Sequence, residues 1–210
     1  MALKGLTKPY CGVYSYDEKT NTVTYENGYA CDKAISYGVS LESEEDNPLY
    51  ANNGIAEESK GTFKSGELSL GTSDLPNGLS KKILGLKTIS KTYGEGKEVE
   101  INVYDDDQAS PYLGFGIIEC HQINNVDQYR AVVLCKVKFN ANEESASTKG
   151  ESVEWTTPEI TAKITRSDEM ATDEAGLKHP WKYDAWFSSE TEADEFLKFV
   201  LGVTEVEEAA

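Results

Sequence analysis

The feature that most constrains the fold is the side-chain alternation in "YRAVVLCKVKF", residues 129–139. Successive side chains of a strand point to opposite faces, and here every second residue, starting at Tyr129, is apolar. The other face carries Arg130, Lys136 and Lys138 beside two apolar residues. We therefore predict a core strand whose inward residues are Tyr129, Ala131, Val133, Cys135, Val137 and Phe139.

Other segments also favour strands. In "AISYGVSL", the apolar residues Ile35, Tyr37, Val39 and Leu41 alternate with small polar ones, as in a half-buried strand. In "GTFKSGELSLG", Phe63 is out of phase with the leucines that follow, which indicates a bulge near Gly66. The chain is thus expected to be mainly β.

Two segments have helical signals. In "SDLPNGLSKKILG", Ser73 or Asp74 can cap a helix that presents Leu79, Ile83 and Leu84 and ends at Gly85. In "SETEADEFLKFVLG", a capping box of Ser189 and Glu192 precedes an apolar stripe that ends at Gly202. The stripe, which should dock on a sheet, consists of Ala193, Phe196, Leu197 and Val200.

The segment from Glu42 to Glu58 holds six carboxylates and no lysine or arginine, with Pro48 and Asn53-Gly54 inside it. It is predicted to be an exposed loop or projecting hairpin. We expect residues 1–203 to form one domain, with 204–210 an acidic tail that has too little apolar surface to order by itself.

The net charge of −17 argues against ordinary DNA binding, because such a surface repels phosphate. No segment approaches the roughly 20 apolar residues of a membrane span, and the N-terminus lacks the apolar run of a signal peptide. We therefore expect a soluble protein made in a cytoplasm. Four cysteines without a C-x-x-C pair are expected to be reduced and mostly buried.

The stretch "ECHQINNVDQYRAVVLC" raises the question of a reactive or metal-binding group made of Cys120, His121 and Cys135. A turn centred near Asn125 would place Cys120 opposite Arg130 or Ala131, which leaves Cys135 roughly 13 to 16 Å further along the strand. A disulfide requires Cα atoms within about 7 Å. His121 would also point to the face opposite Cys120, so we predict no bridge, metal or catalytic pair.

Other candidate chemistry is weak. "GEGKEVE" lacks the first glycine and the Ser/Thr of a P-loop and is interpreted as a charged turn. "DDDQAS" lacks the sixth-position glycine of an EF-hand, so a solvated loop is favoured.

His179, before a proline, is interpreted as a strand-entry residue. Trp181, Tyr183 and Trp186 favour core or interface over a carbohydrate platform, because Trp186 differs in strand parity. We predict no enzyme, cofactor or metal.

Several collinear stretches resemble the major tail proteins of long-tailed bacteriophages, whose rings stack into the tail tube. They are "LYANNGIAEE" (49–58), "FKSGELSLGTSDL" (63–75), "PYLGFG" (111–116), "YRAVVLCKVKF" (129–139), "EESASTKGESVEWTTPEI" (143–160) and "AWFSSETEADEF" (185–196). The sequence departs from the family at Asn52-Asn53, where two aspartates are usual, and at Trp155, where phenylalanine is usual.

This resemblance implies a β-sandwich or barrel-like fold with one or two flanking helices. It also implies homohexameric rings whose sheets join to close a continuous β-barrel around a lumen, with a long loop and the chain ends contacting adjacent rings. It also implies a virion-tail location after assembly in the host cytoplasm, and transit of DNA without sequence-specific binding. The implied partners are the tape-measure, tail terminator and distal tail proteins. The predicted inter-ring contact comprises Leu49, Tyr50, Asn52, Asn53 and Ile55. The alternative is a carbohydrate-binding β-sandwich module.

Overall fold

The computed structural model describes residues 2–31, 34–44, 47–51, 54–59, 61–72, 77–140, 159–170 and 176–204. Within these residues the chain is mainly β, as predicted. The strands are β1 (Ala2–Asp17), β2 (Thr22–Ala30), β3 (Ala34–Ser43), β4 (Asn47–Ala51), β5 (Gly54–Ser59), β6 (Phe63–Thr72), β7 (Lys87–Tyr93), β8 (Lys97–Val103), β9 (Leu113–Ile123), β10 (Val126–Phe139), β11 (Glu159–Thr165) and β12 (Lys182–Phe187). The helices are α1 (Asn77–Leu84) and α2 (Glu190–Val200).

The main sheet is antiparallel and divides at β10. Its strand order is β2-β1-β9-β10-β11-β6-β3, and β12 also pairs with β10. Residues 129–134 of β10 pair with β12, whereas residues 136–139 pair with β11. The two partners therefore lie end to end along one edge of β10, and the sheet splits into two halves that can fold over each other as a sandwich.

The larger core lies between these two halves. Tyr37 of β3 stacks on Phe115 of β9, with ring centroids 6.3 Å apart. Phe63 of β6 stacks on Trp181 at 4.7 Å. Such contacts between strands distant in the sheet order are possible because the sheet curls. The buried aliphatic and aromatic residues of this core include Leu68, Leu70, Leu113, Phe115, Ile117, Val132, Leu134, Val137, Phe139, Ile160 and Ile164.

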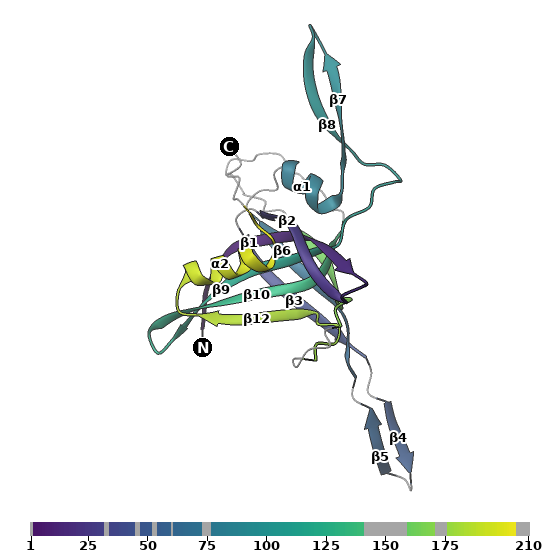
Figure 1. Ribbon diagram of the computed structural model, residues 1–210, viewed down its shortest axis with the longest axis vertical. Helices are drawn as coiled ribbons and strands as arrows, with labels where there is room; N and C mark the ends of the chain where they lie inside the picture. Colours follow the sequence, from purple (N-terminus) through teal and green to yellow (C-terminus); the bar gives the residue numbers. More distant parts are fainter. Residues whose placement is uncertain are drawn as a thin grey trace, which may run out of the picture.

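The second core lies under α2, which covers the other face of β1, β9, β10 and β12 (Figure 1). Ala193 and Leu197 of the predicted stripe are fully buried there, with Phe196 and Val200 partly buried. The helix can approach closely because glycines face it. A Cβ on Gly116 would lie 2.7 Å from a methyl of Leu201, and a Cβ on Gly12 would lie 2.4 Å from the Leu201 carbonyl oxygen.

The predicted alternation of the 129–139 strand is interrupted by a β-bulge. Between Leu134 and Val137 the register with β9 shifts, so that two residues of β10 oppose one of β9. Ala131 and Val133, which precede the bulge, pack beneath α2. Val137, beyond it, packs in the larger core with Phe139. The prediction that all six residues share one face is therefore wrong.

Burial itself agrees with the prediction for most of this strand. Val133, Cys135, Val137 and Phe139 are at most 1% exposed, whereas Tyr129 is only partly buried. The backbone polar groups at the bulge form hydrogen bonds with other elements. Tyr25 donates to the Cys135 carbonyl oxygen at 2.8 Å, and the Cys135 amide donates to the Trp181 carbonyl at 3.0 Å. The bulge is thus a supported feature of the sheet.

Both predicted helices are present. Ser189 caps α2 by accepting a hydrogen bond from the Glu192 amide, and Gly202, with a φ of 63°, follows its end. The reciprocal half of the predicted capping box is not formed, because the Glu192 carboxylate accepts from Ser188 instead. Helix α1 begins at Asn77 and is followed by Gly85, also with positive φ, as predicted.

Two other predictions from the strand pattern need correction. Ile35 is 52% exposed and does not share the buried side of β3, because the β3–β6 register shifts between Ala34 and Ser36. Leu41 is 51% exposed. The bulge predicted near Gly66 is found slightly earlier in β6, where the pairing shifts between Phe63 and Ser65.

Several predicted positions lie outside the described residues. These are the α1 caps Ser73 and Asp74, the loop-tip residues Asn52 and Asn53, the substituted position Trp155, and residues 205–210 of the acidic tail.

Candidate interaction surfaces

Two hairpins project from opposite ends of the molecule along its longest axis (Figure 1). One consists of β4 and β5 and lies within the acidic segment 42–58, which therefore forms the predicted projecting hairpin. The other consists of β7 and β8. The sequence interpretation found only its turn, "GEGKEVE", in which Gly94 and Gly96 have positive φ. The alternation of Ile89 with polar residues, repeated at Val99 and Ile101, was the missed signal.

The backbone register of β4–β5 places the predicted contact residues. Tyr50 pairs with Ile55, and Leu49 pairs with Glu57, with an irregularity between the two pairs. Three of the five predicted residues therefore lie within one short two-stranded unit.

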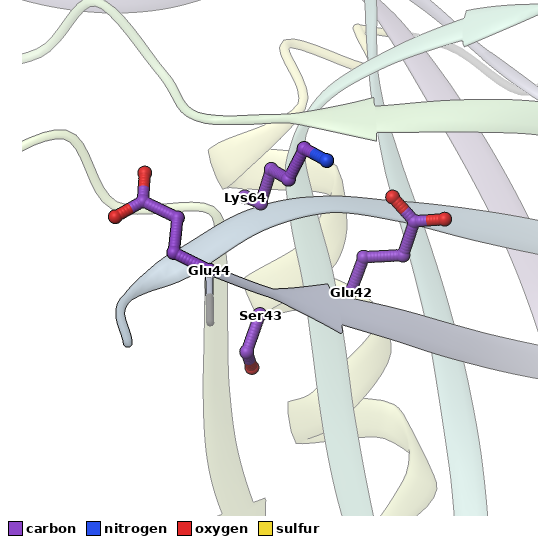
Figure 2. A pocket seen from close by; sticks show the side chains of 4 residues that line it. All are labelled: Glu42, Ser43, Glu44 and Lys64. Atoms are coloured by element: carbon purple, nitrogen blue, oxygen red, sulfur yellow. The ribbon is translucent and has the colours of Figure 1, made fainter. Parts of the chain in front are cut away.

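The base of this hairpin is held by polar contacts between β3 and β6. Ser65 donates to Glu42 at 2.9 Å, and Thr62 donates to Glu44 at 3.0 Å. Arg166 lies 3.7 Å from the Glu44 carboxylate. An open hollow of about 470 Å³ occurs here, lined by Glu42, Ser43, Glu44 and Lys64. Figure 2 shows its two glutamates and Lys64 extending to one side and Ser43 to the other, so the side chains do not converge on a ligand.

The suspected group of Cys120, His121 and Cys135 is dispersed, as predicted. Cys120 pairs with Tyr129, one position away from the expected Arg130, because the turn falls at Asn124 and Asn125. Cys135 is thus six residues, or about 20 Å, further along β10. The described part of the chain contains no cluster of three His, Cys, Asp or Glu side chains arranged to hold a metal.

A different pair of thiols is close in space. The Sγ atoms of Cys11 and Cys31 lie 2.8 Å apart, and both cysteines are buried. Burial raises the pKa of the Cys11 thiol, with a further rise from its hydrogen bond with Cys31. This favours the protonated, unreactive form. No spacing signal in the sequence marks this pair, since it depends on the β1–β2 pairing and on the hydrogen bond from the Cys31 amide to the Pro9 carbonyl.

His121 belongs to a network of polar side chains. Its Nε2 lies 3.0 Å from Glu119, which also contacts Arg130 at 3.4 Å. The Arg130 guanidinium contacts Asp184 at 2.9 Å. The Trp186 ring lies 5.1 Å from the His121 ring and 5.8 Å from the Arg130 guanidinium. These contacts link β9, β10 and β12, which favours a structural role for this network, and within the described residues the buried Nδ1 of His121 has no hydrogen-bond partner.

The prediction that Arg130, Lys136 and Lys138 share one face of β10 is wrong, because the bulge places Arg130 on the side of Val132 and Leu134 and the two lysines on the opposite side. Two of these three cations are largely neutralised. Arg130 contacts two carboxylates, and Lys136 pairs with Asp168 while lying over the rings of Tyr14 and Tyr112. Lys138 also lies over the Tyr112 ring and is exposed. Cations already paired with carboxylates offer little to a phosphate backbone.

The three aromatic residues considered for carbohydrate binding do not form one platform. Trp181 packs in the larger core against Phe63. Tyr183 packs beneath α2, and its hydroxyl donates to Glu169. Trp186, 42% exposed, lies beside His121. His179, just before β12, donates from Nδ1 to the Ser167 carbonyl oxygen, 3.0 Å away.

Neither described helix is long and apolar enough to cross a membrane. In comparisons with known proteins, no family model matches the chain and no curated protein shows significant sequence similarity.

Proposed function

We propose that this chain is a structural subunit of a bacteriophage tail tube, which assembles as stacked homohexameric rings and conducts DNA to the host. The observation that carries the proposal is the subunit's shape. A mainly β body bears projecting hairpins at opposite ends of its longest axis, one of them in the stretch that resembles the family's ring-to-ring loop (Figure 1). A head-to-tail contact between different surfaces repeats indefinitely, as a tube requires.

The body also offers sheet edges for lateral contacts. Strand β3 pairs only with β6, and β2 pairs only with β1, within the described part of the chain. Ile35 and Leu41 of β3 are each more than half exposed. Open strand edges pair readily with other chains, and closure into a ring would cover them. These features support a role in which each subunit adds strands to a shared barrel.

The charge balance suits a conduit. The net charge is −17, and the cations of β10 are mostly paired with carboxylates. Unpaired lysines along a lumen would bind successive phosphates and retard DNA. In this proposal the tape-measure, tail terminator and distal tail proteins are the other partners, and the protein has no enzymatic activity.

Negative-stain microscopy and light scattering of the purified protein test the proposal. We expect rings with sixfold symmetry and tubes, whose length increases with protein concentration. A protein that stays strictly monomeric at high concentration over a range of salt conditions would contradict it.

A more specific prediction concerns the β4–β5 hairpin. Replacing Leu49, Tyr50 and Ile55 together with serine should leave a folded protein that forms rings but does not stack, because apolar anchors supply most interface energy. Serine in place of the three threonines Thr88, Thr92 and Thr20 provides a triple-variant control. Tubes of normal length from the hairpin variant would refute the assignment.

A further inference from the structure

The β7–β8 hairpin has one apolar and basic face that no other part of the described chain covers. Its cross-strand pairs are Ile89 with Ile101, Lys91 with Val99, and Tyr93 with Lys97. Directly paired residues point to the same side of a two-stranded sheet, so these six side chains share a face. Ile89, Val99 and Tyr93 are 44%, 42% and 57% exposed.

The opposite face of this hairpin is polar and turns toward the body. It carries Thr88, Ser90 and Thr92 on β7 and Glu98, Glu100 and Asn102 on β8. Glu100 forms an ion pair with Lys81 of α1 at 3.1 Å. The polar face is therefore the one directed at α1, which leaves the apolar and basic face directed away from it.

An exposed two-stranded hairpin is marginally stable in water by itself. At the base of this hairpin, Lys81 forms an ion pair with Glu100 and Lys87 forms one with Asp105. Lys91 and Lys97 form no ion pair with any residue that the structure describes. An apolar strip flanked by unpaired lysines is suited to a partner that is itself apolar and acidic.

We propose that this face docks the β4–β5 hairpin of a second copy of the chain. The segment 42–58 that contains β4 and β5 has the complementary chemistry, with six carboxylates, no basic residue, and Leu49, Tyr50 and Ile55 as apolar residues. The two hairpins also lie at opposite ends of the longest axis (Figure 1). Stacking of subunits along this axis would bring the acidic hairpin of one subunit to the end of the next subunit that carries the β7–β8 hairpin.

This inference rests on the proposed function in one respect, which is that stacking along the long axis occurs. It adds the receiving surface and the charge pairing. Because Lys91 and Lys97 are exposed, salt should weaken stacking by screening their charges, with a Debye length of about 10 Å in 0.1 M salt.

A charge-swap experiment tests the pairing of the two hairpins. The variant Lys91→Glu/Lys97→Glu and the variant Glu57→Lys/Glu58→Lys should each stack about tenfold more weakly than the wild type, as measured by sedimentation of tubes at fixed concentration. Combining all four substitutions in one chain restores the net charge of −17 and the opposite signs at the contact. We expect this quadruple variant to recover stacking.

The control variant Glu98→Lys reverses a charge on the polar face of the same hairpin and should stack like the wild type. Circular dichroism and melting temperature should match the wild type for all variants, because the substituted side chains of β7–β8 are exposed. Wild-type tubes together with normal stacking of Lys91→Glu/Lys97→Glu, or no recovery in the quadruple variant, would overturn the inference while leaving the proposed function intact.

If the wild type forms neither rings nor tubes, the proposed function fails, and the hairpin contact is then read from analytical ultracentrifugation. A salt-sensitive dimer that Lys91→Glu/Lys97→Glu weakens would still support it. Absence of such a dimer would overturn it as well.

Discussion

Asp194 is a buried carboxylate where α2 meets β1, and its removal should destabilise the fold measurably. Its side chain is 9% exposed. The Tyr10 hydroxyl donates to Oδ1 at 2.7 Å, while Lys198 and Lys8 contact Oδ2 at 2.8 and 3.3 Å. Burial raises the pKa of this carboxyl, but the hydrogen bonds with Lys198, Tyr10 and Lys8 outweigh it and hold the pKa below the usual value.

The size of the loss of stability depends on which buried partner is left without a hydrogen bond. In Asp194→Ala the Tyr10 hydroxyl, in a residue only 4% exposed, loses its acceptor, and an unsatisfied buried donor costs about 1–3 kcal/mol. The two lysines are partly exposed and add little after solvent screening. We expect a loss of about 2–3 kcal/mol at pH 7. For a chain of this length that corresponds to a decrease in melting temperature of about 4–12 °C.

Thermal denaturation followed by circular dichroism measures this loss. Asp194→Asn retains an acceptor for Tyr10 and should lose less than Asp194→Ala. Adding Tyr10→Phe to Asp194→Ala removes the orphaned hydroxyl and should cost little more. The exposed neighbour variant Glu195→Ala serves as control.

The pH dependence supplies a second check. A carboxyl whose pKa is lower in the folded state stabilises the protein above its unfolded pKa, about 4, and loses that contribution as the pH falls through the folded value. The difference between the wild type and Asp194→Ala should therefore shrink below about pH 4. A difference independent of pH, or Asp194→Ala as stable as Glu195→Ala at pH 7, would refute the reasoning.

Two further predictions concern the close packing of a glycine and the reactivity of the cysteines. Gly12→Ala should cost about 1–3 kcal/mol of stability, because the new Cβ would lie 2.4 Å from the Leu201 backbone oxygen. Gly5→Ala in the same strand is the control. Its Cβ would have nothing within 4 Å, so it should be nearly neutral in the same melting assay. Iodoacetamide at pH 8 should modify Cys120 first, since burial raises the pKa of Cys135 to about 12 and also raises that of Cys11. Mass spectrometry that found Cys135 labelled as fast as Cys120 in folded protein would contradict this.

Local signals in the sequence were sufficient where one element decides the outcome. Ser189 caps α2, and the 3.6-residue stripe of that helix identifies Ala193 and Leu197 as buried. Gly85 follows α1 because a left-handed residue is needed there. Strands β4 and β5, which lie within the acidic segment 42–58, form a projecting hairpin (Figure 1), as the turn residues and charges of that segment predicted.

The sequence predicted only part of the candidate interaction surfaces. The sequence identified the β4–β5 hairpin, but of the β7–β8 hairpin it identified only the turn, because the flanking strands are mostly exposed and lack a buried apolar face. The proposed function rests on the subunit's shape together with a family resemblance in the order and spacing of several segments. Its tests are the assembly experiments above.

By itself the sequence determined the mainly β class, the two helices and the buried character of the 129–139 strand, because periodicity and capping are properties of neighbouring residues. Only the tertiary structure decided which core each residue enters. The bulge at Cys135 depends on support from Tyr25 and Trp181, and it moves Val137 to the opposite core from Val133. A one-residue shift in register reverses every later side chain, and such a shift is set by partners far away in the sequence.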